Sequence, residues 1–359
     1  MSNYTWPRCI AHLDLDAFYA TVEEVLNPAL KGVPLMVVMG DDLGNRGAIA
    51  TASYAARRFG VRSAMSVANA RKLCPDGVYL PVRHHLYREF SQKVMSLLAE
   101  EAAALEQVSI DEAYLDLGHI ADPPALAQRL QGRIIAEIGL SASVGLATNK
   151  LTAKMASGHL KPGGLTVVPP GEEAEFLAPL PVGKLHGVGP KTAARLQAIG
   201  IQTIGDLAEA DIDMLRTNFG PNIGLEMQQH AAGIDPRQIE TEREIKSLSY
   251  ERTFLEDNAN RRDLWHNIQE MAVGLEGRLQ KNNLLARTVS IKLRFSNWKT
   301  ITRAETLLTP TDKAATIAAS AGRLMRLGWK RGTPLRLIGV RVSNFVEIDA
   351  PRQTSFELQ

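Results

Sequence analysis

Five carboxylates fall into two short segments whose apolar residues are spaced as in strands. The segment "HLDLDAF" contains Asp14 and Asp16, and "SIDEAYLDL" contains Asp111, Glu112 and Asp116. Carboxylates gathered at strand ends repel one another unless a cation compensates them, and Mg²⁺ commonly bridges protein carboxylates to substrate phosphates. Two such ions about 3.5–4 Å apart can clamp both oxygens of an in-line phosphoryl displacement. Each segment alone fits surface acids beside a turn, and a segment that could bind phosphate, described below, favours the metal chemistry.

Asp111 and Glu112 are adjacent, and adjacent residues of a regular strand point to opposite faces. A hairpin tip at this position would break the alternation and let both side chains face one point. We therefore expect a turn at Asp111–Glu112.

The segment "TASYAARRFG" supplies groups that suit a phosphate chain. Thr51, Tyr54 and Arg57 are spaced by three residues, so a helix would place them on one face. A hydroxyl, a phenol and a guanidinium together suit a triphosphate. The alternative is an ordinary polar helix face.

A second phosphate signal lies in "GKLHGVGPKTAARLQAIGIQTIGDLA". Gly187 and Gly189 predict a tight turn before a helix that begins near Pro190. Backbone N–H groups at a helix start can hold a phosphate, and the spacing is not that of a Walker loop. The segment predicts a helix-hairpin-helix element that grips a DNA backbone without reading its sequence; a plain helical turn is the alternative.

The elements that must position these groups alternate between strand and helix over residues 1–170. This is an α/β pattern. We expect strands at 8–15, in "GVPLMVVM" and in "LSASVGLAT", and helices in "DAFYATVEEVL", at 83–104, at 123–139 and in "NKLTAKMASGHL".

The composition changes near residue 170, where "VVPPGEEAEFLAPLPVG" marks a boundary. Residues 173–236 look small and all-helical, and a polar linker follows at 237–245. In the last module, Val289, Ile291 and Leu293 alternate with polar residues, and two helices fit between strands. This predicts an α/β sandwich with one basic sheet face.

The whole chain of 359 residues carries a net charge of +2, but the charge is unevenly distributed. Residues 246–346 hold 18 Lys and Arg against 8 Asp and Glu, a surplus of ten positive charges, so the remaining 258 residues carry −8. Such asymmetry favours a polyanion as the partner of the last module; a solvated charged surface is the alternative.

Other features exclude several classes of protein. Cys9 and Cys74 form no CxxC pair, and the eight histidines show no HExxH spacing, so we expect neither zinc nor a disulfide framework. No apolar stretch is long enough to span a membrane. We expect a cytoplasmic protein with two reduced thiols.

Eight ordered segments resemble the Y-family translesion DNA polymerases, especially the DinB or DNA polymerase IV branch, over roughly residues 8–346. They are "HLDLDAFYATVEE", "GAIATASYAARRFGVRSAM", "SIDEAYLDL", "SVGLATNKLTAKMAS", "KPGG", "HGVGPKTAARLQAIGIQTIGDL", "KSLSYERTF" and "LIGVRVSNF". Ser66 stands where that family usually has proline, a departure from the family's pattern in a local turn of the fingers.

The resemblance implies a multi-domain α/β fold, a right hand with a ferredoxin-like palm, small fingers, a helical thumb and an α/β little finger. It places the palm at 1–17 and 83–172, the fingers at 18–82, the thumb at 173–236, the little finger at 246–346 and a flexible tail at 347–359. The basic module found from charge is thus the little finger.

The resemblance also implies roles for single residues. Asp14 and Asp111 would bridge two Mg²⁺ ions, Glu112 would hold the ion that activates the primer 3′-hydroxyl, and the carbonyl of Leu15 would ligate the other ion. Asp16 and Asp116 would be structural. Tyr19 would be the steric gate against the ribose 2′-hydroxyl. The nucleotide-binding set would be Phe18, Tyr19, Thr51, Tyr54, Arg57 and Lys161; Ala48 and Ala50 would cover the nascent base pair; Gly187, Gly189, Lys191, Lys292, Arg294 and Arg341 would contact DNA.

The activity expected from this resemblance is low-fidelity, template-directed DNA synthesis from dNTPs on primer–template DNA, by a monomer without proofreading. A sliding clamp would bind the tail, where Gln353, Phe356 and Leu358 offer an amide and two apolar anchors; a disordered end is the alternative. A non-catalytic adaptor of a translesion complex and a nucleotide cyclase are the other candidate functions. The intact carboxylates oppose the adaptor, and the basic last module opposes the cyclase.

Overall fold

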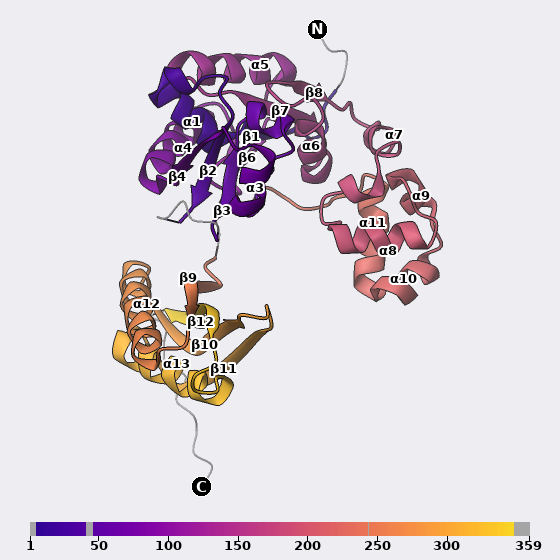
Figure 1. The fold of residues 1–359 in the computed structure, drawn as a ribbon. Helices are drawn as coiled ribbons and strands as arrows, with labels where there is room; N and C mark the ends of the chain where they lie inside the picture. Colours follow the sequence, from indigo (N-terminus) through magenta and orange to yellow (C-terminus); the bar gives the residue numbers. More distant parts are fainter. Residues whose placement is uncertain (1–4, 41–45, 243, 348–359) are drawn as a thin grey trace. The chain divides into compact units, whose positions relative to one another are not determined.

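The computed structural model describes residues 5–40, 46–242 and 244–347. The chain divides into two compact units, Met1–Glu242 and Arg243–Gln359 (Figure 1). Within the described residues, no helix combines the length and the apolar character that crossing a membrane requires.

A five-stranded sheet forms the centre of the first unit, in the order β5-β6-β1-β7-β8. The middle strand β1 pairs antiparallel with both β6 and β7, whereas β7 and β8 are parallel. The strands are β1 (Ile10–Leu15), β5 (Ala104–Gln107), β6 (Glu112–Asp116), β7 (Ala142–Ala147) and β8 (Leu165–Val167).

Helices cover both faces of this sheet. Leu13 and Leu15 pack in a core with residues of α4 and α5, whereas Ile10, on the opposite face, packs with Ala153 of α6. Burying one leucine side chain contributes about 1.5–3 kcal/mol to folding. The helices predicted here are confirmed as α1 (Phe18–Leu26), α4 (His84–Ala99), α5 (Pro123–Arg133), which continues into a π-helical turn at Ile134–Ile138, and α6 (Lys150–Ser157).

Gly145 on β7 explains why α6 lies so close to the sheet. A Cβ atom built on Gly145 would lie 2.1 Å from the Ala153 carbonyl oxygen and 2.3 Å from the Ser157 nitrogen. Only glycine permits this approach. The close packing fixes where the side chains of α6 lie relative to β1 and β6.

A three-stranded sheet in the order β3-β2-β4 follows α1 in the chain. Its core of Met36, Val38 and Ile49 is largely separate from the core of the larger sheet. The elements are β2 (Leu35–Met39), which confirms the predicted buried strand, β3 (Ala48–Ala52), β4 (Val78–Pro81), the 3₁₀ turn Pro28–Leu30, α2 (Tyr54–Arg58) and α3 (Val67–Leu73).

The stretch after β8 is helical, as expected. Among its described residues it contains no strand, and it has its own apolar core. Asn149 Nδ2 donates to the Gly233 carbonyl at 2.9 Å and so joins the end of this stretch to the start of α6. The elements are α7 (Glu173–Leu177), the 3₁₀ turn Val182–Lys184, α8 (Pro190–Ala198), α9 (Ile204–Glu209), α10 (Ile212–Phe219) and α11 (Pro221–Ala231).

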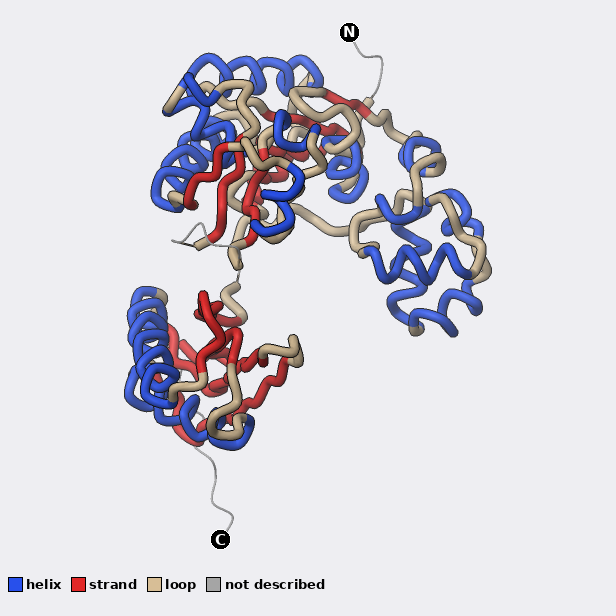
Figure 2. Tube along the Cα trace, in the orientation of Figure 1, coloured by secondary structure: helices blue, strands red, loops and turns tan. Residues whose placement is uncertain are grey.

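The second unit is an antiparallel sheet in the order β11-β10-β12-β9 with two helices on one side, as Figure 2 shows. The predicted apolar face is confirmed, because Val289, Ile291 and Leu293 are buried beneath the helices. The edge strands β9 and β11 were not predicted. The elements are β9 (Ser247–Asn258), α12 (Arg261–Lys281), β10 (Leu284–Phe295), β11 (Thr300–Thr311), α13 (Ala314–Gly328) and β12 (Leu335–Glu347).

Candidate active site

The pairing of β1 with β6 brings the two acidic segments together. Asp14 lies directly opposite Glu112 in the register, so both side chains are on the same face of the sheet. Asp111 lies in the turn between β5 and β6, which confirms the predicted hairpin turn for Asp111, whereas Glu112 is already the first residue of β6. Its carbonyl accepts a hydrogen bond from the Leu15 nitrogen at 2.9 Å, which ties the tip to the end of β1.

Two lysines compensate these carboxylates. Lys161 Nζ forms an ion pair with Asp14, and Lys154 Nζ donates to Glu112 Oε2 at 2.7 Å. Asp111 instead accepts a hydrogen bond from Ser109 Oγ at 2.5 Å. Each of the three acids thus has a different partner within the first unit.

Burial and charge shift the pKa values of this cluster in opposite directions. Burial raises the pKa of Asp14 to about 6, although the nearby Lys161 charge opposes the rise. The pKa of Glu112 falls to about 2, because the His12 ring and the Lys154 ammonium favour its ionised form more than burial disfavours it. Burial lowers the pKa of His12 to about 4, so its imidazole is neutral at pH 7. Lys154 therefore provides the positive charge beside Glu112.

The donor set suits a hard divalent cation, which prefers carboxylate and carbonyl oxygens. Asp14 and Glu112 are each stabilised by a cationic side chain, which is the kind of compensation that a metal ion would also provide. In the part of the chain that the structure describes, no three His, Cys, Asp or Glu side chains gather closely enough to hold a metal ion. The acids turn toward Lys161, Lys154 and Ser109 instead.

Asp16 has a structural environment. Its side chain accepts hydrogen bonds from Ser141 Oγ at 2.7 Å, Ser143 Oγ at 2.8 Å, the Gly163 nitrogen at 2.8 Å and Tyr54 Oη at 3.2 Å. Only 2% of the residue is exposed. A buried carboxylate with four donors has little capacity left for a ligand.

Phe18 and Tyr19 are the first two residues of α1, which follows β1 after the two residues Asp16 and Ala17. Tyr19 stacks on Tyr87 with ring centroids 4.1 Å apart, and its pKa is raised by burial and by the negative charge of Asp111. Phe18 is only 2% exposed. Its side chain is a core residue, so only its backbone remains available to a nucleotide.

The predicted helical face of Thr51, Tyr54 and Arg57 is wrong in one respect. Thr51 lies in strand β3, because helix α2 begins only at Tyr54, after Ser53 caps it. Tyr54 and Arg57 do share a face, with the guanidinium 4.7 Å from the ring centroid. Arg57 Nε also donates to the Ala52 carbonyl at 3.0 Å, and the half-buried Ala48 and Ala50 lie on the same strand as Thr51.

The predicted DNA contacts lie in two places. Gly187, with φ +94°, and Gly189 precede α8, and Lys191 is exposed in its first turn. In the second unit, Lys292 Nζ pairs with Glu251 at 2.9 Å, and Arg294 Nε donates to Thr300 Oγ1 at 3.0 Å. Arg341 is exposed opposite Ser290, on the same sheet face as Lys292 and Arg294.

The sequence reasoning missed Lys154, His12 and Ser109. His12 Nδ1 lies 2.7 Å from Ser157 Oγ, and its Nε2 lies 3.9 Å from Glu112. The sequence did contain one indication of Lys154. Lys150 and Lys154 are four residues apart on a helix that follows a buried strand, so they lie on the same helix face. Lys150 pairs with Glu106 at 2.6 Å, so this helix face neutralises two acids. The identity of those acids depends on strand pairing, which the spacing does not reveal.

Family profiles match most of the chain. The impB/mucB/samB family matches residues 13–158, the helix-hairpin-helix motif of this family matches 170–201, and its C-terminal domain matches 245–356. The chain is 41% identical to DNA polymerase IV of Methanoculleus marisnigri and 38% identical to DNA polymerase IV of Gluconobacter oxydans. Each alignment covers 98% of this chain. It covers 98% of the Methanoculleus marisnigri protein and 99% of the Gluconobacter oxydans protein.

Solved structures agree with the sequence relatives. A Y-family DNA polymerase chimera of Dbh and Dpo4 aligns with a TM-score of 0.86, and DinB from Sulfolobus solfataricus with 0.65. Both are 28% identical to this chain and cover 94% of it and 99% of their own length. The chain therefore belongs to the Y-family DNA polymerases of the impB/mucB/samB type. It is a DNA-directed DNA polymerase of translesion synthesis, and its curated relatives carry the name DNA polymerase IV; they give no support to the adaptor or the cyclase.

Proposed function

We propose that Asp14, Asp111 and Glu112 form the site at which the polymerase joins an incoming deoxynucleotide to the primer 3′-hydroxyl. The observation that carries this proposal is the register of β1 and β6, which places Asp14 opposite Glu112 with Asp111 at the adjoining tip. The family uses divalent metal ions, and we propose two Mg²⁺ ions held by these carboxylates and the Leu15 carbonyl. When bound, they supply charge stabilisation to the attacking and leaving oxygens.

The lysines prepare the carboxylates for this role. The His12 ring and the Lys154 ammonium hold the pKa of Glu112 below its usual range, and Lys161 compensates Asp14 while the site holds no other cation. Lys161 also has the position that the family uses to bind the triphosphate. We propose that Lys161 leaves Asp14 and turns to the phosphates when the nucleotide enters.

The proposed nucleotide site extends from α1 to α2. Thr51, Tyr54 and Arg57 would bind the triphosphate, together with the backbone at Phe18, and Tyr19 would exclude the ribose 2′-hydroxyl by contact with its ring. Ala48 and Ala50 would lie against the nascent base pair. Small side chains there leave room for damaged template bases, which accounts for low fidelity.

We further propose the following division of labour. Residues 1–17 and 83–172 are the palm, 18–82 the fingers, 173–236 the thumb, 237–245 a linker and 246–346 the little finger. Gly187, Gly189 and Lys191 bind the DNA backbone through the thumb, and Lys292, Arg294 and Arg341 bind it through the little finger. One relative structure is titled an insertion ternary complex of Dbh DNA polymerase, which supports DNA and a nucleotide as the partners.

The polymerase is proposed to act as a monomer in the cytoplasm, where DNA is accessible. The tail that was expected to bind a sliding clamp, with Gln353, Phe356 and Leu358, lies outside the described residues. The clamp therefore stays a proposal based on the sequence. Comparing clamp-stimulated extension by the full chain and by a chain lacking residues 351–359 tests it.

Primer extension with Mg²⁺ tests the proposed site. Glu112→Gln should abolish extension, because it removes a carboxylate charge that the proposed Mg²⁺ ion needs. Asp116→Asn is the matched control, since among the described residues the Asp116 side chain only accepts a hydrogen bond from the nitrogen of Gly118, which follows the end of β6, at 2.9 Å. Equal extension by both variants would refute the assignment.

A further inference from the structure

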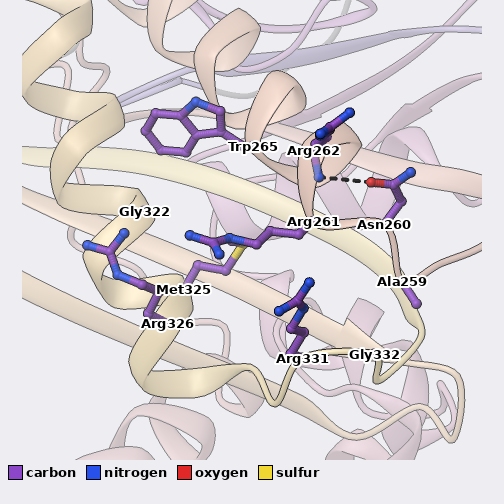
Figure 3. A pocket seen from close by; sticks show the side chains of 10 residues that line it. All are labelled: Ala259, Asn260, Arg261, Arg262, Trp265, Gly322, Met325, Arg326, Arg331 and Gly332. Carbon is purple, nitrogen blue, oxygen red and sulfur yellow. Dashed lines mark hydrogen bonds between the residues drawn. The ribbon is translucent and has the colours of Figure 1, made fainter.

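A cavity of about 750 Å³ lies at one end of the second unit, where β9 leads into α12 and α13 leads into β12. Arg261, Arg262, Arg326 and Arg331 line it, together with Trp265. In Figure 3, the side chain of Arg261 extends from the start of α12 toward Arg326, with Arg331 beside them. The volume falls within the range of roughly 300–1,000 Å³ that small-molecule sites have.

Among the residues that the structure describes, these four arginines have no ion-pair partner. None of their guanidinium groups makes a hydrogen bond or an ion pair with another described residue. Other cations of the same unit behave differently: Arg252 pairs with Glu270, and Arg323 pairs with Glu305. Four like charges around one cavity repel one another, so packing within the fold does not explain them.

Two of these arginines lie at a helix N-terminus, where a positive charge is unfavourable. Arg261 and Arg262 are the first two residues of α12, a helix of 21 residues whose N-cap Asn260 accepts a hydrogen bond from the Arg262 nitrogen at 2.9 Å (Figure 3). The N-terminus of a helix carries partial positive charge, so cations there destabilise the helix. The helix start and the arginines together form an electropositive cavity that suits phosphate groups.

Trp265 adds a flat apolar surface to this cavity. A Cβ atom on Gly322 would lie 2.5 Å from the indole ring, so the ring rests directly against α13 at its glycine. The indole is half-buried and lines the cavity. Such a fixed aromatic ring is suited to stacking on a nucleobase.

We propose that this cavity binds a nucleotide, with the arginines holding its phosphates and Trp265 stacking on its base. The nucleotide is either a free nucleoside triphosphate or part of a single strand of DNA, since both present the same groups. The cavity lies entirely within the second unit and contains none of the residues assigned to catalysis. The proposed nucleotide cavity can therefore be tested independently of the carboxylate site.

The test is binding by the full chain, measured by calorimetry at low salt with EDTA present. The probes are inorganic tripolyphosphate, dATP and an eight-nucleotide oligo-dT. R326Q/R331Q removes two cavity charges, and K281Q/R287Q removes two exposed charges of the same unit that do not line the cavity. Any binding near the carboxylates is common to both variants, so the difference between them isolates the cavity.

We expect R326Q/R331Q to bind at least one probe roughly tenfold more weakly than K281Q/R287Q. Weaker dATP binding would identify a free nucleotide as the ligand, and weaker binding of oligo-dT alone would identify the DNA strand. Trp265→Leu should weaken binding of dATP or oligo-dT while leaving tripolyphosphate binding unchanged. Equal affinities of the two double variants for every probe would overturn the site, and an unaffected Trp265→Leu variant would overturn the stacking.

Discussion

In the first unit, acidic residues at the ends of β1 and β6 are neutralised by lysines of the same unit, whereas several arginines of the second unit have no acidic partner among the described residues. Lys161 pairs with Asp14 and Lys154 with Glu112. Arg331 and Arg341, by contrast, are exposed and unpaired within residues 244–347. A site that exchanges small ions must control its charge closely, while a surface that attracts a polyanion depends on charge left uncompensated. The predictions below test this contrast.

The largest effect is expected when a carboxylate of the compensated site is neutralised. Asp111→Asn should lower the rate of nucleotide addition by at least about a hundredfold, because charge stabilisation of the reacting phosphate is lost. Single-turnover extension measures the rate, and a fluorescence titration measures primer–template binding. Binding should stay close to that of the unchanged protein. Substantial extension by the variant would show that Asp111 is not part of the site.

An ion pair elsewhere in the first unit, between the buried Asp235 carboxylate and the partly exposed Arg237 side chain, should control stability rather than chemistry. Asp235 accepts hydrogen bonds from the Leu151 nitrogen at 2.9 Å and from Arg237 Nε at 2.7 Å. We expect Asp235→Asn to lower the free energy of unfolding by about 2 kcal/mol, measured by urea denaturation. Asp213→Asn is the control, since the Asp213 side chain is 85% exposed.

The stability contribution of Asp235 should depend on pH. Burial alone would raise the pKa of Asp235, but the Arg237 side chain and the backbone donors lower it overall. A carboxylate with a lowered folded-state pKa stabilises the fold above its unfolded pKa of about 3.9 and loses that contribution as the pH falls. The stability difference between the unchanged protein and Asp235→Asn should shrink below about pH 4. A constant difference down to pH 2 would contradict the ion-pair account.

In the first unit, the Tyr19 ring should discriminate between ribonucleotides and deoxynucleotides by its shape, independently of the charges of the carboxylate site. Tyr19→Ala should raise incorporation of ribonucleotides relative to deoxynucleotides by roughly tenfold or more, because the excluding ring is gone. Tyr19→Phe keeps the ring and its stacking on Tyr87 and should keep the discrimination. If Tyr19→Ala discriminates as well as Tyr19→Phe, the residue is only a packing aromatic.

The smallest effect is expected for the salt dependence of DNA binding, when either of two cations on the sheet face of the second unit is neutralised. Arg341 is unpaired among the described residues, whereas Lys292 is held by Glu251. Arg341→Gln should reduce the dependence of log affinity on log salt by roughly 0.9, the value of one phosphate contact. Lys292→Gln should reduce it less, because Glu251 already offsets that charge. Equal slopes for the two variants would remove the distinction between paired and unpaired cations.

Much of the site was readable because its chemistry lies in local segments. Asp14 and Glu112 stand in short strands with clear alternation, and the adjacency of Asp111 and Glu112 predicted the turn in which Asp111 lies. Thr51 was placed wrongly, because "AIATA" consists mostly of small residues that fit a helix as well as a strand, and only pairing with β2 makes it a strand. The contact of Lys154 with Glu112 spans 42 residues, so no local pattern could reveal it.

The missed strands of the second unit have a common physical cause. Strands β9 and β11 are the two edges of the four-stranded sheet, and most of their residues are exposed. The buried apolar alternation that identified β10 and β12 is therefore weak in both. Periodicity finds strands that contribute to a core, and it overlooks strands held mainly by backbone hydrogen bonds to a neighbour.

The two edge strands, which also expose Leu255 and Leu308, have a consequence for self-association. An outer strand presents unpaired backbone groups to which a second copy of the chain could add its own strand. Strand β11 contains Pro310, which lacks an N–H donor, and β9 carries Glu251, Arg252 and Glu256 within six residues. Proline and charge are devices by which natural sheets prevent edge-to-edge growth. Some of the sequence features that hid these strands from prediction, the proline and the charges, are therefore also features that oppose pairing of this sheet with a second copy.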